Sequence, residues 1–129
     1  MKKSILVIIL MTSVNVVNAL DCRYPQQSLR FCFEWAASLI DINAKHFGGD
    51  PDVGVYRNPK WIMAADYIDS QCSYNGGVNN KQLHSDLAAT TIYADFIAGN
   101  SKSIEAIKGS CFSLMNHHIN DLSSFVKNN

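Results

Sequence analysis

The chain has 129 residues, with eleven basic and eleven acidic side chains, and 47% of its residues are apolar. A chain of this length corresponds to one domain. It has no cluster of Lys and Arg and no alternation of aromatic with basic residues, so nucleic acid is not expected as a partner.

The first 19 residues have the pattern of a secretion signal. Met1-Lys2-Lys3 is a positively charged start, Ser4 to Val17 is apolar apart from a few small polar residues, and Val17-Asn18-Ala19 has the spacing of a signal-peptidase site. Cleavage after Ala19 would leave residues 20–129, which we expect to form a single domain. The lysine pair and the short apolar run are typical of bacteria and predict the periplasm, an oxidising compartment.

Two features predict a product without a membrane anchor. Lipoprotein processing requires a small residue before the lipidated cysteine, whereas Asp21 precedes Cys22. The apolar run before Ala19 is too short and too close to the cleavage site for a convincing membrane span, and no later segment is apolar enough for one.

Glycine and proline divide the rest of the chain into four helical blocks. Apolar residues recur at three- and four-residue steps from about Gln26 to Phe47, and Gly48-Gly49 ends this first helix. Asp50 to Arg57 is expected to be an exposed loop, in which Val53 to Tyr56 could be extended. Asn58-Pro59 begins the second helix, because Asn caps free backbone amides and Pro suits the first helical position. The residues expected to face inward are Leu29, Cys32, Phe33, Ala36, Ile40 and Phe47 in the first helix, and Trp61, Ala64, Ala65, Ile68 and Cys72 in the second.

A third helix is expected from about Lys81 to Ala98, and Gly99-Asn100 ends it. The fourth block runs from Lys102, with Ser101 as its cap, to about Lys127. Gly109 could kink or break it, since Gly costs roughly 1 kcal/mol relative to Ala inside a helix. No segment alternates long enough for a sheet, so we predict an all-α fold, a small disulfide-stapled bundle of four to five helices. The residues expected to face inward are Leu83, Leu87, Thr91, Ala94 and Ile97 in the third helix, and Ile104, Ile107, Cys111, Leu114, His118, Leu122 and Phe125 in the fourth.

Four cysteines, Cys22, Cys32, Cys72 and Cys111, are expected to form disulfides outside the cytoplasm. They allow three complete pairings, and the sequence alone does not select one of them. No Cys-x-x-Cys pair indicates a redox centre, and no cysteine has a second ligand at zinc-finger spacing.

Other candidates for chemistry have structural explanations. His117 and His118 point about 100° apart on a helix and do not easily share a metal. His118 falls on the apolar stripe and is expected to be a satisfied, partly buried ring, whereas His117 is expected to face solvent. Asp66 and Asp69 share a helix face, as an acid–base pair would, but are expected to be solvated. We therefore predict no catalytic residue, no metal and no cofactor, and a protein that is not an enzyme.

Two polar loops, residues 50–57 and 73–82, form the candidate partner-binding surface. Aromatic side chains in such loops suit protein recognition because they bring contact area at low entropy cost. The alternative is that both loops are plain connectors. The candidate contact residues are Tyr56, Arg57, Tyr74, Asn75 and Asn79.

Three segments from Trp61 onward form a pattern in chain order. A cysteine-bearing helix, Ile62 to Cys72, is followed by an Asp-Leu-Ala-Ala-Thr-Thr helix with aromatic residues, Asp86 to Phe96. The third segment, Cys111-Phe-Ser-Leu-Met, continues into His118-Ile-Asn-Asp-Leu. In these segments, about half of the chain, the sequence resembles the amidase immunity proteins of type VI secretion systems.

This resemblance implies a small periplasmic protein that blocks a peptidoglycan-cleaving amidase by filling its catalytic cleft with a loop or a helix end. It favours a Cys72–Cys111 pair, and Cys22–Cys32 would then fasten the N-terminal segment to the first helix. Cys22, Cys32 and the first helix have no counterpart in the family pattern. The alternative function is a periplasmic accessory factor for assembly of a pilus or secretion apparatus, and the sequence leaves a homodimer open.

Overall fold

The structure is a computed structural model that describes residues 20–24, 27–74 and 81–129, without the side chains of residues 81–87 and 89. The expected signal segment, residues 1–19, lies outside the described residues. The described part contains five α-helices, one short 3-10 helix and no strand, which confirms the predicted all-α fold. In the same part of the chain, no helix combines the length and the apolarity needed to cross a bilayer. The elements are α2 (Leu29–Phe47), η1 (Gly54–Arg57), α3 (Pro59–Cys72), α4 (Lys81–Ile97), α5 (Ser101–His117) and α6 (Ile119–Asn128).

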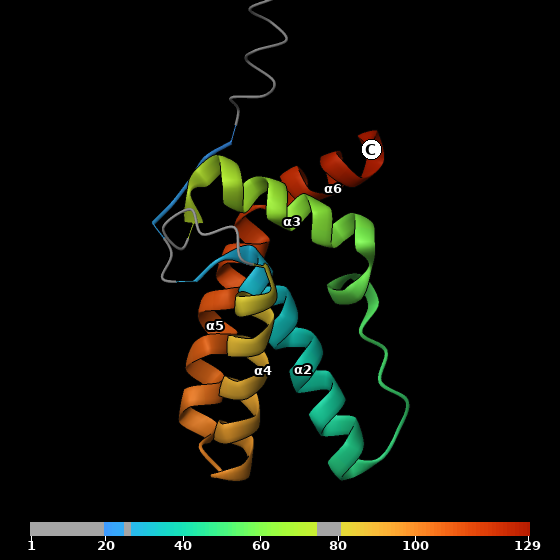
Figure 1. Ribbon diagram of the computed structural model, residues 1–129, viewed down its shortest axis with the longest axis vertical. Helices are drawn as coiled ribbons and strands as arrows, with labels where there is room; N and C mark the ends of the chain where they lie inside the picture. The colour runs from blue at the N-terminus through green and yellow to red at the C-terminus, as the bar shows by residue number, and fades with distance from the viewer. Residues whose placement is uncertain (1–19, 25–26, 75–80) are drawn as a thin grey trace, which may run out of the picture.

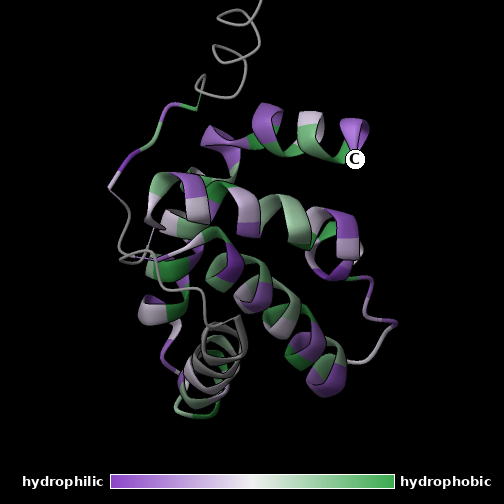
Figure 2. Cartoon of the chain, turned by 45° about the horizontal axis from the view of Figure 1, so that its top comes forward, coloured by the Kyte–Doolittle hydropathy of each residue, from purple (hydrophilic) through white to green (hydrophobic). Residues whose placement is uncertain are grey.

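Helix α2 is the centre of the bundle and contacts α3, α4, α5 and η1. Figure 1 shows α4 and α5 side by side in the lower part of the molecule, with α3 crossing above them and α6 packed on α3. Figure 2 shows that the helices carry both hydrophobic and hydrophilic residues. Each helix is therefore buried on some of its faces and not as a whole.

Helix α2 is buried on more than one side, which a single predicted stripe does not describe. Leu29, Cys32 and Phe33 join the main core with residues of α3, α5 and α6. Trp35, which the prediction omitted, is fully buried in a second cluster with Ala88 and Ile92 of α4. The prediction that Phe47 faces inward is wrong, because the last turn of α2 lies at the lower end of the bundle and leaves this ring 79% exposed.

The predicted inward face of α4 is also wrong where its side chains are described. Ala88 and Ile92 are fully buried against Trp35, whereas Ala94 is exposed and Ile97 is 60% exposed. Apolar residues occur around much of this helix, so their spacing defines no single stripe. The side chains of Leu83 and Leu87 lie outside the described residues.

The helix ends follow local rules of capping. Asn58 accepts a hydrogen bond from Lys60 N–H at the start of α3, as predicted, and Pro59 occupies the first helical position. Gly48, with φ of 85°, ends α2 in a backbone conformation that suits glycine. Asn100, rather than the predicted Ser101, caps α5 by accepting from Ser103 N–H.

The predicted fourth block is two helices, and the break lies at His118 rather than at Gly109. Helix α5 passes through Gly109 without interruption; this residue is exposed, and nothing packs where a Cβ atom would lie. His118 ends α5 and precedes α6. The expectation that Val53 to Tyr56 is extended is wrong as well, since η1 spans Gly54–Arg57.

All four cysteines are bonded, but the proposed pairs Cys22–Cys32 and Cys72–Cys111 are wrong. Cys32 on the inner face of α2 is bonded to Cys111 on α5, with Cα atoms 5.2 Å apart. Cys22 is bonded to Cys72 at the end of α3, with Cα atoms 5.4 Å apart. The physical reason is that Cys32 and Cys111 both face the main core, where the two helices meet. One bond therefore fastens α2 to α5, and the other fastens the N-terminal segment to α3.

Candidate functional site

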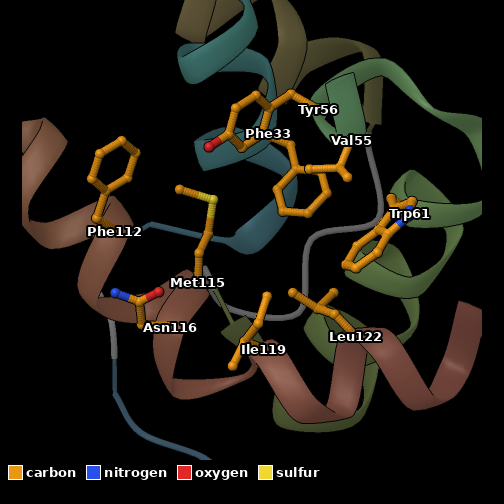
Figure 3. Close-up of a pocket in the computed structure, with 9 residues that line it drawn as sticks. All are labelled: Phe33, Val55, Tyr56, Trp61, Phe112, Met115, Asn116, Ile119 and Leu122. Atoms are coloured by element: carbon orange, nitrogen blue, oxygen red, sulfur yellow. The ribbon is translucent and has the colours of Figure 1, made fainter. Parts of the chain in front are cut away.

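The candidate site is an apolar pocket with a volume of about 250 Å³, at the meeting point of α2, η1, α3, α5 and α6. Figure 3 shows its side chains converging from these elements. Eight of the nine lining residues are apolar or aromatic, and Asn116 supplies the remaining amide. The lining residues are Phe33, Val55, Tyr56, Trp61, Phe112, Met115, Asn116, Ile119 and Leu122.

The upper wall of the pocket is η1, which two contacts hold against α2. The ring of Tyr56 meets the ring of Phe33 edge-on, with centroids 5.7 Å apart and planes at 84°. This T-shaped geometry is favourable for two aromatic rings. Arg57 forms an ion pair of 2.6 Å with Asp41 of α2, although both side chains are more than one-third exposed. The wall is therefore set by packing, with a modest electrostatic contribution.

The opposite wall is the joint between α5 and α6. Met115 and Asn116 lie in the last turns of α5, and Ile119 and Leu122 lie at the start of α6. The direction of the chain at this joint thus determines how four of the nine lining residues converge.

Three lining residues leave much of their apolar surface exposed. Val55 and Phe112 are each 38% exposed, and Ile119 is 46% exposed. Leu122, in contrast, also lines the pocket but is only 1% exposed. A concave apolar site with an exposed apolar rim is typical of surfaces that bind another molecule.

The α5–α6 joint is held by a buried hydrogen-bond network. His118 is fully buried; its Nδ1 donates to Asp121 at 2.9 Å and its Nε2 bonds to the Tyr74 hydroxyl at 2.5 Å. Tyr74 also accepts from the backbone N–H of Arg23 at 3.0 Å, and burial raises the pKa of this tyrosine. The prediction that His118 is hydrogen-bonded agrees with this geometry, although the ring is fully rather than partly buried.

The neighbouring histidine does not face solvent as predicted. The side chain of His117 is only 12% exposed and donates a hydrogen bond from Nε2 to the backbone carbonyl of Asp21. Both histidines thus form hydrogen bonds within the fold. The part of the chain that the structure describes contains no group of three His, Cys, Asp or Glu side chains placed to hold a metal ion.

The prediction that Asp66 and Asp69 are solvated is wrong for both, and most clearly for Asp69. Asp69 is 9% exposed and accepts from the backbone N–H groups of Leu29 at 2.7 Å and Arg30 at 2.9 Å. It therefore caps the N-terminus of α2 from a different helix, and burial raises the pKa of its carboxyl to about 7. Asp66 is largely buried too, and pairs with Arg30 at 3.1 Å, which also binds Glu34.

The five predicted partner contacts have different positions. Tyr56 lines the pocket, and Arg57 follows it with its side chain 45% exposed. The proposal that Tyr74 contacts a partner is wrong, because this ring is 2% exposed inside the core. Asn75 and Asn79 lie outside the described residues.

The rim residues Phe112 and Ile119 were missed by the sequence reasoning. Both fall off the apolar stripe of the fourth predicted block, and a large apolar residue on the outer face of an amphipathic helix is the signal that could have found them. Trp61 was recognised only as a core residue, although it lines the pocket.

No protein-family model, curated protein or solved structure matches the chain.

Proposed function

We propose that the protein is a secreted binding module that acts by contacting another protein through the apolar pocket. The observation that carries this proposal is the exposed rim of Val55, Phe112 and Ile119 around a hollow in a bundle held by two disulfides. A pre-formed site of this kind binds with little cost of ordering, because its walls belong to fixed elements. The two disulfides suit an oxidising compartment, for which we propose the periplasm.

The chemistry of the pocket favours binding over catalysis. Its one amide, Asn116, has no proton to transfer at ordinary pH, and the other lining groups are hydrocarbon, aromatic or thioether apart from the hydroxyl of Tyr56. The buried titratable groups His118 and Asp69 are bonded to other parts of the core. Such a site offers shape and apolar surface to a partner.

For the partner we propose a cell-wall-degrading amidase, neutralised by occlusion of its active site. Support for this target comes from the resemblance of the segments from Trp61 onward to amidase immunity proteins. The pocket includes Phe112 of the last of these segments, and Trp61, which directly precedes the first. The disulfide pairing that the resemblance favoured does not occur, so the proposal depends on the surface of these helices and not on the cysteines.

The test is a pull-down with the tagged mature protein from its native periplasm, with and without secreted proteins of a neighbouring strain, read by mass spectrometry. Ile119→Asp places a charge on the pocket rim. Ile97→Asp is the matched control, because Ile97 is similarly exposed, at 60%, but lies at the end of α4.

We expect capture of a peptidoglycan hydrolase in near-stoichiometric amount by the wild-type protein and by Ile97→Asp, and its loss with Ile119→Asp. Equal capture by both variants would place the binding surface elsewhere. Capture of pilus or secretin components would instead make the protein an assembly factor.

A further inference from the structure

We infer that the pocket takes one bulky apolar side chain of a protein partner, with a carboxylate of that partner held about one helix turn away by Lys108. This inference rests on the proposed function and specifies the chemistry of the partner at the same site.

The volume of the pocket suits a single large side chain. A cavity of roughly 150 Å³ lined by aliphatic and aromatic residues is enough to bind benzene. At about 250 Å³, this pocket has room for a phenyl ring and the atoms that attach it to a chain. The rings of Trp61, Tyr56 and Phe33 supply aromatic walls to such a ring, and Figure 3 shows them facing the hollow.

Helix α5 adds a line of three groups along one edge of the pocket. Lys108, Phe112 and Asn116 are spaced four residues apart, so they lie on one face of the helix. The ammonium of Lys108 lies 6.0 Å from the centroid of the Phe112 ring. Four residues of α-helix correspond to about 6 Å along the axis. A partner chain in the pocket would therefore meet an amide and a cation within about two helix turns.

The charges near this edge favour an anionic group. No ion pair of Lys108 occurs within the described residues, whereas Arg57 is paired with Asp41 and Asp121 with His118. Glu105 is exposed on α5, but lies one turn farther from the pocket than Lys108. The half-buried Lys108, beside the Phe112 ring, is thus available to a carboxylate of the partner, at the modest strength of a partly exposed ion pair.

Two small probes test separately whether the pocket binds an aromatic side chain and whether Lys108 binds a carboxylate beside it. N-acetyl-phenylalanine carries a phenyl ring and a carboxylate, and N-acetyl-phenylalaninamide carries the same ring without the charge. Binding to the mature protein is measured by titration in two-dimensional NMR at low ionic strength. We expect both probes to shift the signals of Phe112, Ile119 and Trp61, with the carboxylate probe binding about two- to fivefold more tightly.

Two variants test whether Lys108 causes the difference in affinity between the two probes. Lys108→Gln is expected to make the two probes bind equally, and high salt is expected to do the same in the wild-type protein. Lys102→Gln, on the exposed first turn of α5, is the control and should leave the ratio unchanged.

Equal binding of the two probes to the wild-type protein would overturn the role of Lys108 while leaving the pocket as a binding site. Shifts outside the pocket, or none, would overturn the whole inference. The pull-down with Ile119→Asp is read independently, so failure of the proposed function is distinguished from failure of this inference.

Discussion

The disulfide pairing can be tested by removing cysteines two at a time. Since Cys22 is bonded to Cys72 and Cys32 to Cys111, replacing Cys22 and Cys72 by Ala removes one complete bond and leaves no unpaired thiol. Replacing Cys22 and Cys32 removes the same number of sulfur atoms but breaks both bonds. It leaves Cys72 and Cys111 without their partners.

The lengths of the closed loops determine the expected loss of stability. The bonded cysteines are 50 residues apart in the Cys22–Cys72 bond and 79 apart in the Cys32–Cys111 bond. In the chain-entropy description, loops of these lengths correspond to about 4 kcal/mol each at 25 °C. A change of 1 kcal/mol moves the Tm of a domain of this size by roughly 4–8 °C. The variant without Cys22 and Cys72 is therefore expected to melt about 15 °C or more below the wild type.

The variant without Cys22 and Cys32 is expected to lose about twice as much free energy, which approaches the whole stability of a small domain. The assay combines thermal unfolding followed by circular dichroism with thiol titration in denaturant. We expect two thiols per chain in this variant and none in the variant without Cys22 and Cys72. The reverse result, two thiols in the Cys22/Cys72 variant and none in the Cys22/Cys32 variant, would refute the pairing in the structure.

Three further predictions concern the interior and the wall of the pocket. Because burial raises the pKa of Asp69 from 3.8 to about 7, the folded protein binds a proton here that the unfolded chain has released. The free energy of unfolding of the wild type, relative to Asp69→Asn, should thus fall between pH 4 and pH 7 by up to about 1.4 kcal/mol per pH unit; a rise would contradict this. Tyr74→Phe removes the hydroxyl that bonds Nε2 of the buried His118 ring, and should lower the free energy of unfolding, measured in urea, by about 1–3 kcal/mol. The control Tyr67→Phe, on a half-buried ring, should lower it much less. Arg57→Ala removes an exposed ion pair and should change stability by less than about 1 kcal/mol; a larger loss would show that this pair holds η1.

The parts of the fold that follow from local chemistry were predictable from the sequence. The start of α3 depends on Asn58 and Pro59, and the end of α2 depends on Gly48, and each signal acts within a few residues. The apolar stripe of the last block also predicted the burial of Cys111, Leu114 and Leu122. In each case the physical cause lies within one helix.

Features that depend on how helices meet were not predictable in this way. Periodicity identified one buried face of α2, but Trp35 is buried because α4 covers another face. Asp69 looked like a surface carboxylate because nothing in its own helix indicates that the N-terminus of α2 lies against it. The pairing of Cys32 with Cys111 depends in the same way on the meeting of two helices distant in sequence.

The same limit applies to the candidate site. Its walls come from five elements, and no short motif connects Val55 with Trp61 or Phe112. The break at His118 was hidden because a histidine on an apolar stripe fits a continuous helix as well as a joint. Its role emerges only when Tyr74 and Asp121 are placed beside it.

The network of His118 and the pocket belong to one arrangement. His118 lies between Met115 and Asn116 on one side and Ile119 and Leu122 on the other, and all four line the pocket. The hydrogen bonds of His118 to Asp121 of α6 and to Tyr74, two residues after α3, thus fix the pocket wall that a partner would contact. Residues that look reactive in the sequence therefore serve to position an apolar surface. For this reason, substitutions at His118 should impair partner binding through the shape of the pocket, even though its ring is fully buried.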